Sequence, residues 1–165
     1  MKHIVVSFIG PDRPGLVDAL SNTINKYQGN WQTSSMHHLS GFFAGVIEIA
    51  VEAQHADTLV SEIKSITDLN SQIETASPHS ESQPANLTLE LTANDRVGIV
   101  QEISSVIHHQ GGNLLKLIST QDSAPHSALI MFKAKALVSI AEDDIDELIE
   151  AIEDIADDIM VDISR

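Results

Sequence analysis

Residues 10–16 read GPDRPGL and residues 93–99 read ANDRVGI, and this repeated stretch decides the fold. The two stretches share Asp-Arg, a glycine and a following apolar residue at a constant spacing of 83 positions. The same spacing relates residues 29–30 to residues 112–113, which are Gly-Asn in both places. Identities that cluster and keep one offset indicate a duplicated unit.

The segment between the copies, residues 77–85, is rich in serine and proline and has no apolar periodicity. That composition is typical of a linker. We therefore predict a first domain over residues 1–76 and a second domain over residues 86–165.

Apolar periodicity predicts the same order of elements in each copy: strand, helix, two strands, helix, strand. The first helix of each copy ends at glycine, and proline or glycine marks the turn between the middle strands. The fold class is therefore α+β, with two ferredoxin-like βαββαβ units, each an antiparallel four-stranded sheet with two helices on one face. The expected middle strands cover residues 30–39, 42–53, 113–121 and 126–136.

The third strands align at the same offset, Gly45, Ile47 and Ile49 with Ala128, Ile130 and Phe132. The apolar positions of the second helix, however, are offset by 89 positions. This growth predicts six extra residues in the second copy, around residues 137–141.

The junction between the first strand and first helix has groups that suit a small zwitterion. A helix start presents unpaired amides and a partial positive charge, which favour a carboxylate. Pro14 suits the first turn of its helix, and Gly15 and Gly98 leave room for a ligand. Asp12 and Asp95 are candidates to accept from an ammonium group. At the start of the next strand, Asn30 and Asn113 are candidates to offer an amide.

Structural interpretations of the same residues stay open. The aspartates could cap the helices, and the glycines could permit close packing of helix on sheet. Arg13 and Arg96 could clamp a carboxylate or form an ion pair with a neighbouring acidic side chain.

Composition excludes several functions. A formal net charge of −15 argues against direct binding of nucleic acid. With no cysteine the chain has no thiolate site or disulfide, which together with the short apolar runs predicts a cytoplasmic protein with no signal peptide and no membrane span. The adjacent histidines at 37–38 and 108–109 diverge on a strand or helix, so we expect no metal. No catalytic motif is evident, so we expect no enzyme and no cofactor.

Residues 142–158 contain ten acidic and no basic residues around a continuous apolar stripe. The stripe predicts an amphipathic helix with an anionic outer face. That face is either only solvated or docks on a basic partner.

The D-R-P-G-L and D-R-V-G-I loops, each followed by a helix that ends in G-N, resemble the tandem ACT-domain proteins. The resemblance covers almost the whole chain apart from the linker. It implies an amino-acid-sensing regulator whose loops and second strands bind the ligand, commonly between two ACT units. The residues at those positions are Asp12, Arg13, Pro14, Gly15, Leu16, Asn30, Asp95, Arg96, Val97, Gly98, Ile99 and Asn113.

Among stand-alone tandem ACT proteins, the resemblance further implies a co-repressor that acts by protein contact on the transcriptional activator of the glycine cleavage operon. Glycine is the expected small amino acid, and a homodimer is the expected assembly. The second copy departs from the pattern, with Asn94 and Val97 where the first has Pro11 and Pro14. This departure predicts a second site that is weaker, altered or purely structural.

Two other functions compete with this expectation. One is a regulatory or scaffold subunit of an amino-acid metabolic enzyme that no longer binds ligand. The other is a small ferredoxin-like hydrolase that holds an acyl phosphate with Arg13.

Overall fold

The computed structural model describes residues 1–76 and 83–165, and the chain divides into two compact units, Met1–Glu81 and Ser82–Arg165. Most of the predicted linker, residues 77–82, lies outside the described residues. The domain boundaries at 76 and 86 therefore remain a prediction.

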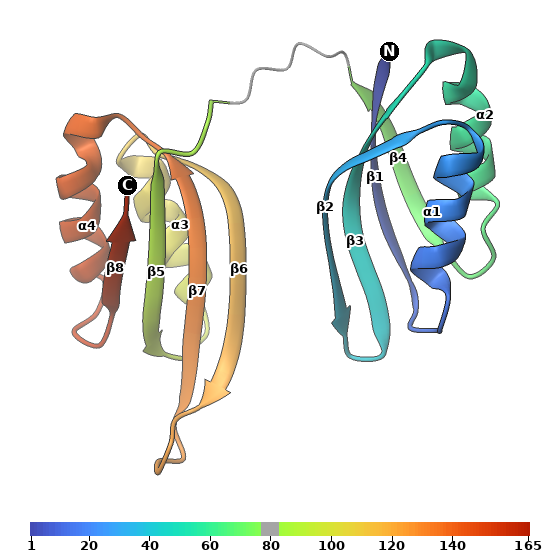
Figure 1. The fold of residues 1–165 in the computed structure, drawn as a ribbon. Helices are drawn as coiled ribbons and strands as arrows, with labels where there is room; N and C mark the ends of the chain where they lie inside the picture. Colours follow the sequence, from blue (N-terminus) through green and yellow to red (C-terminus); the bar gives the residue numbers. More distant parts are fainter. Residues whose placement is uncertain (77–82) are drawn as a thin grey trace. The chain divides into compact units, whose positions relative to one another are not determined.

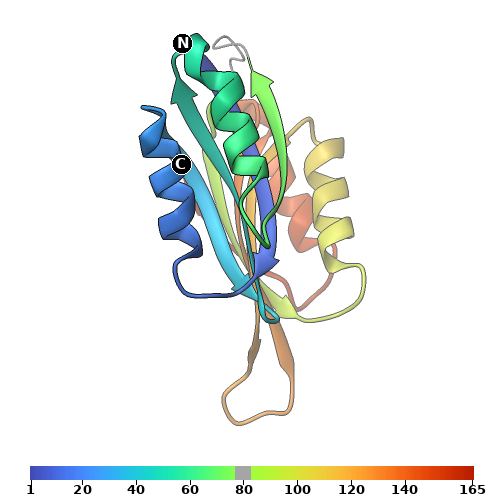
Figure 2. The ribbon, with the colours of Figure 1, turned by 90° about the vertical axis from the view of Figure 1, so that its right-hand side faces the viewer.

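The first unit has the predicted βαββαβ order. Its strands form one antiparallel sheet in the order β2-β3-β1-β4. Both helices cover one face of that sheet (Figures 1 and 2). The elements are β1 (Lys2–Pro11), α1 (Leu16–Lys26), β2 (Asn30–Leu39), β3 (Phe42–Val51), α2 (Ala53–Lys64) and β4 (Asn70–Ala76).

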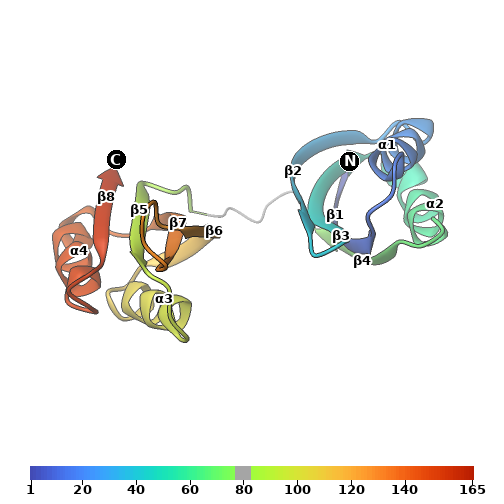
Figure 3. The ribbon, with the colours of Figure 1, turned by 90° about the horizontal axis from the view of Figure 1, so that it is seen from below.

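The second unit repeats this topology, with the sheet order β6-β7-β5-β8 and its helices again on one face (Figure 3). A short 3-10 turn, Glu142–Asp144, precedes its last helix. That helix ends at Glu153, so the acidic segment 142–158 is helical only in its middle. The elements are β5 (Leu87–Asn94), α3 (Ile99–His109), β6 (Asn113–Ser123), β7 (Ile130–Ser139), α4 (Ile145–Glu153) and β8 (Met160–Ser164).

Each unit buries its own apolar core between helices and sheet. Alternate residues of β1 and β5 point to the core, because successive side chains of a strand face opposite sides. The helices contribute residues at helical spacing: Leu16, Leu20 and Ile24 in α1, and Ile99, Ile103 and Ile107 in α3.

The pairing of the third strands corrects the predicted alignment. In the first unit Ile9 of β1 pairs with Ala44 of β3. The residue equivalent to Ile9 in β5 is Thr92, 83 positions later, and it pairs with Lys133 of β7. Lys133 lies 89 positions after Ala44 and not 83. The offset is thus already 89 in β7, so Ile47 corresponds to buried Ala136 and not to Ile130. The six extra residues lie in the β6–β7 hairpin and not around residues 137–141. The alignment was wrong because alternating apolar residues match almost equally well after an even shift.

The helix ends also differ in part from expectation. Gly111 has the left-handed backbone that is common in a glycine after a helix (φ 77°), but in the first unit Gln28 holds that conformation (φ 57°) and Gly29 does not. A Cβ on Gly29 would lie 2.9 Å from Cγ2 of Ile24, and one on Gly112 would lie 3.0 Å from Cγ2 of Ile107. Both glycines therefore permit close packing.

Across residues 1–76 and 83–165, no helix is long and apolar enough to cross a membrane.

Candidate ligand-binding site

The loop between the first strand and first helix has the same backbone in both units. Gly15 (φ 83°) and Gly98 (φ 91°) are the N-cap residues of α1 and α3, and neither cap has a side-chain hydrogen bond. Pro14 therefore precedes the helix. The prediction that it lies in the first turn was wrong. The amides that open a helix have no intrahelical acceptor. Each helix start thus presents amide donors and the positive end of the helix dipole to an anion, although in the second unit the N–H of Ile99 donates to the carbonyl of Arg96 at 3.4 Å.

This geometry decides between the interpretations of the loop residues. Asp12 and Asp95 do not cap the helices, since the cap positions belong to the glycines. A Cβ on Gly15 would meet nothing within 4 Å, and one on Gly98 only Oε1 of Glu102 at 3.8 Å. These glycines are therefore required by their left-handed backbone and not by close packing.

Each loop aspartate is held by a side chain from the second strand of its own unit. Oδ2 of Asp12 lies 2.6 Å from Nδ1 of His38, and Oδ2 of Asp95 accepts from Nε2 of Gln121 at 2.5 Å. His38 and Gln121 occupy equivalent positions, 83 residues apart, as the aspartates do. The same orienting contact is thus built twice with different donors, and in each case it leaves Oδ1 as the second carboxylate oxygen.

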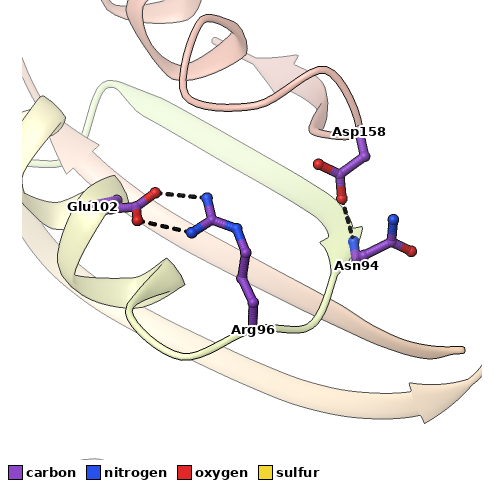
Figure 4. A network of polar contacts seen from close by, with 4 residues as sticks. All are labelled: Asn94, Arg96, Glu102 and Asp158. Atoms are coloured by element: carbon purple, nitrogen blue, oxygen red, sulfur yellow. Dashed lines mark hydrogen bonds and ion pairs between the residues drawn. The ribbon is translucent and has the colours of Figure 1, made fainter.

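The two loop arginines have different partners. Nη1 and Nη2 of Arg96 donate to the two carboxylate oxygens of Glu102 at 2.8 and 2.6 Å, a bidentate pair (Figure 4). Hydrogen bonding to Arg96 holds the pKa of Glu102 below its ordinary value, and the bond to Glu102 raises the pKa of Arg96. In the second unit the arginine therefore forms the ion pair that the sequence left as one alternative.

Arg13 has no such partner on its helix, because Ala19 stands where the second unit has Glu102. Its Nη2 donates to the carbonyl oxygen of Thr67 at 3.2 Å. Its Nε is buried and has no acceptor among the described residues. A buried donor without a partner is uncommon in folded proteins, and this nitrogen contrasts with the fully paired guanidinium of Arg96.

The exchange of Pro11 for Asn94 also has a structural consequence. The N–H of Asn94 donates to Oδ2 of Asp158 at 2.7 Å, which ties the loop to the segment before β8 (Figure 4). Pro11 has no N–H, so the first unit cannot make this bond.

The second loop borders an open pocket of about 820 Å³. Its walls come from the loop, the first two turns of α3, the end of β6 and the start of β7. They include Asp95, Arg96, Gly98, Ser104, Gln121 and Phe132. The predicted residues Val97 and Ile99 also line it, so the loop residues predicted for this unit are brought together.

The asparagines are not near the loop aspartates of their own unit. Asn30 pairs with Ala50, which pairs with His3 at one end of β1, whereas Asp12 follows Pro11 at the other end. Asn113 pairs with Ser139 and is likewise remote from Asp95. Eight residues of strand separate the ends, about 26 Å at the usual rise. One unit therefore does not bring its asparagine and its loop aspartate together, and the wider expectation that these residues bind a ligand stays a prediction.

His38 and Gln121 were missed as site residues in the sequence. His38 was considered only as part of a histidine pair, and no group of three metal-ligating side chains occurs in the part of the chain that the structure describes. The available signal was position: both residues carry a polar donor 26 residues after the loop aspartate. Only the pairing of β2 and β6 shows that this position reaches the loop.

The family model of the ACT domain matches residues 2–74, a range that runs from β1 into β4 of the first unit. The second unit repeats its topology, and the chain has a tandem ACT-like architecture.

Two solved structures share the fold over the whole length. One is an unknown protein from Galdieria sulphuraria, 23% identical with a TM-score of 0.82, covering 99% of this chain and 97% of that one. The other is a "putative glycine cleavage system transcriptional repressor", 17% identical with a TM-score of 0.72, covering 99% of this chain and 98% of that one. No curated protein matches the chain. At these identities the likeness concerns the fold.

Proposed function

We propose that this protein is a non-catalytic regulator that binds a small amino acid, glycine first, at its strand-to-helix loops. The observation that carries the proposal is the repeated helix start with a left-handed glycine cap and an aspartate held beside it. The amides suit the ligand carboxylate, and Oδ1 of the aspartate suits its ammonium group.

The free donor of Arg13 supports the first loop as the stronger carboxylate site. A ligand carboxylate would give Nε of Arg13 the acceptor that it lacks. In the second unit a carboxylate would compete with Glu102 for Arg96. We therefore propose that the two loops bind the same ligand with unequal affinity, the second more weakly.

Asn30 and Asn113 serve this site only if a loop of another ACT-like unit approaches them, since their own loops are at the far end of the sheet. β2 and β6 are edge strands, whose free backbone groups are open to pairing. We propose that ligand binding is coupled to pairing of ACT-like units, with a homodimer as the working form.

We further propose that the protein represses by contact with the activator of the glycine cleavage operon, and that glycine relieves the repression. Two observations support this proposal. The chain is similar in fold to the structure described as a glycine cleavage system transcriptional repressor. Its net charge of −15 disfavours direct contact with DNA. The competing candidate is an enzyme subunit that has lost its ligand.

Calorimetry on the full chain with glycine, serine and alanine tests the sensing half. We expect binding that Asp12→Asn weakens at least about tenfold, because a charge-assisted hydrogen bond to the ammonium group is lost. Asp57→Asn, which removes an exposed carboxylate from α2, is the matched control and leaves the affinity unchanged. Absence of heat with every amino acid at millimolar concentration contradicts the proposal.

A reporter of the glycine cleavage operon tests the regulatory half. The double variant Asp12→Asn, Asp95→Asn is expected to repress at all glycine concentrations, because it still contacts the activator but no longer senses the ligand. If its response to glycine equals that of the unsubstituted protein, the scaffold alternative is favoured.

A further inference from the structure

The β6–β7 hairpin of the second unit is built differently from its counterpart. Ser40 and Gly41, with φ of 51° and 83°, join β2 to β3 directly. In the second unit Asp122 pairs with Met131 as Leu39 pairs with Phe42, so residues 123–130 stand where the first unit has two residues. We call residues 123–130 the hairpin tip. It extends beyond the other strands of its sheet (Figures 1 and 2).

The tip is closed by its own backbone hydrogen bonds. The N–H of Ala124 donates to the carbonyl of Leu129 at 3.0 Å, and the N–H of Ser127 to the carbonyl of Ala124 at 3.3 Å. The tip nevertheless presents two adjacent large apolar side chains, Leu129 and Ile130, which are 57% and 52% exposed. These side chains contribute little to the core, so their apolar character has no explanation in the stability of the fold.

The root of the tip is bonded to the candidate ligand loop. The N–H of Asp95 donates to the carbonyl of Ile130 at 2.8 Å, and Gln121 on β6 holds the Asp95 carboxylate. Val97, in the same loop, is fully exposed. Hydrogen bonds thus join the loop to the segment that carries the tip, which gives a direct physical connection through which a ligand in the loop would act on a partner at the tip.

The unit that carries the tip is negative as a whole. The second unit, residues 84–165, has 15 acidic and 5 basic residues. Arg96, Lys133, Lys135 and Arg165 each pair with an acidic side chain of the same unit. Lys133 is the lysine nearest the tip in sequence, and it is neutralised by Asp122 at 3.0 Å. A nucleic acid or an anionic membrane would be repelled, whereas a basic protein surface would be attracted.

We propose that the hairpin tip is the surface on which this regulator docks a protein partner, and that the partner presents an apolar depression bordered by lysine and arginine. Leu129 and Ile130 fill the depression, and the negative charge of the unit accelerates and orients the encounter. The proposal rests on the proposed function in one respect: a ligand bound at the adjacent loop is expected to change the contact between the tip and its partner.

The test begins with a photo-reactive benzophenone amino acid placed at Leu129 of the full chain in its native cells, and at Leu39 as the control. Leu39 is exposed at the equivalent hairpin of the first unit. Mass spectrometry identifies the cross-linked protein and the segment contacted. We expect one protein, cross-linked from position 129 and not from position 39, through an apolar segment flanked by basic residues. No cross-link, or equal cross-links from both positions, overturns the proposal.

The purified partner is then measured against the full-length variants. Leu129→Ser with Ile130→Thr is expected to weaken binding at least about tenfold, and the association rate is expected to fall as salt is raised. Replacement of residues 123–130 by Ser-Gly, the turn of the first unit, is expected to do the same. The matched control is Leu39→Ser with Phe42→Thr, which removes an exposed apolar pair from the other hairpin. Affinity unchanged by the tip variants, or reduced equally by the control, overturns the proposal.

Calorimetry with glycine on the same variants separates this inference from the proposed function. Tip variants that lose the partner and keep glycine binding support docking at the tip. If the unsubstituted protein binds no amino acid but still binds the partner through the tip, sensing fails and docking stands. If glycine binds and the tip variants keep full partner affinity, docking at the tip fails and sensing stands.

Discussion

The glycines of this chain are required for two different physical reasons. Gly15 adopts a left-handed backbone in open space, whereas Gly29 has no such backbone and lies against the side chain and carbonyl oxygen of Ile24. An L-residue is strained in the first position by its own Cβ and in the second by its neighbours.

Substitution separates the two reasons. Gly15→Ala is expected to lower the free energy of unfolding by about 1–2 kcal/mol, and Gly15→Asn by less, because asparagine tolerates the left-handed region. At Gly29 the order reverses, since asparagine is larger than alanine and the site is closed. Urea unfolding of the four variants measures this, and asparagine less harmful than alanine at both positions would contradict it.

His38 is a positioning residue for Asp12, and the second unit shows which exchange preserves the contact. His38→Gln reproduces the donor found at Gln121 and is expected to retain amino-acid affinity within about threefold, whereas His38→Ala is expected to weaken it about tenfold. His37→Ala is the control on the neighbouring residue, whose side chain faces the other side of the strand. Calorimetry is the measurement, and equal affinities for all three variants would remove His38 from the site.

At the scale of elements, the start of α3 contains an ion pair that α1 lacks. Arg96 and Glu102 lie six residues apart and join the loop to the first turn of the helix. Ala19 stands at the equivalent place in α1 and offers no partner. The same loop thus has a bidentate ion pair to its helix in one unit and none in the other.

This pair makes stability depend on pH in a defined direction. Hydrogen bonding to Arg96 lowers the pKa of Glu102 in the folded chain, so its contribution is present above about pH 4.5 and is lost as pH falls through the folded value. Glu102→Gln is therefore expected to be less stable than the unsubstituted chain at pH 7 and equal to it well below pH 4. Urea midpoints at both pH values measure this. Because the pair is exposed, the difference is small and shrinks in salt, and Glu150→Gln controls for loss of one negative charge.

At the scale of the whole molecule, each core draws all its buried residues from one unit. Leu59 in α2 and Leu148 in α4 occupy equivalent positions, 89 residues apart, and both are fully buried. The single tryptophan, Trp31, belongs to the first unit. Its fluorescence therefore reports the unfolding of that unit, while far-ultraviolet circular dichroism reports both units.

Core truncation is expected to act on one unit at a time. Leu59→Ala should lower the stability of the first unit by about 2–5 kcal/mol and shift the Trp31 transition, because it leaves a cavity. Leu148→Ala should produce a loss of similar size that appears in the dichroism and leaves the Trp31 midpoint in place. Coincident shifts of both signals in both variants would contradict the separation of the cores.

The sequence by itself determined the duplication, the order of elements in each unit, the turns at Gly41 and Pro125, and the loop residues, because these follow from local periodicity and from backbone preferences of glycine and proline. Only the tertiary structure shows the register of the third strands and the position of the six-residue insertion. It also shows that His38 and Gln121 contact the loop aspartates and which partners the two arginines have. Finally, it shows that the asparagines are far from the loop aspartates of their own unit. These features depend on which strand lies beside which and on its direction. Alternating apolar residues fit several registers equally well, so only the closed sheet and its packed helices select one.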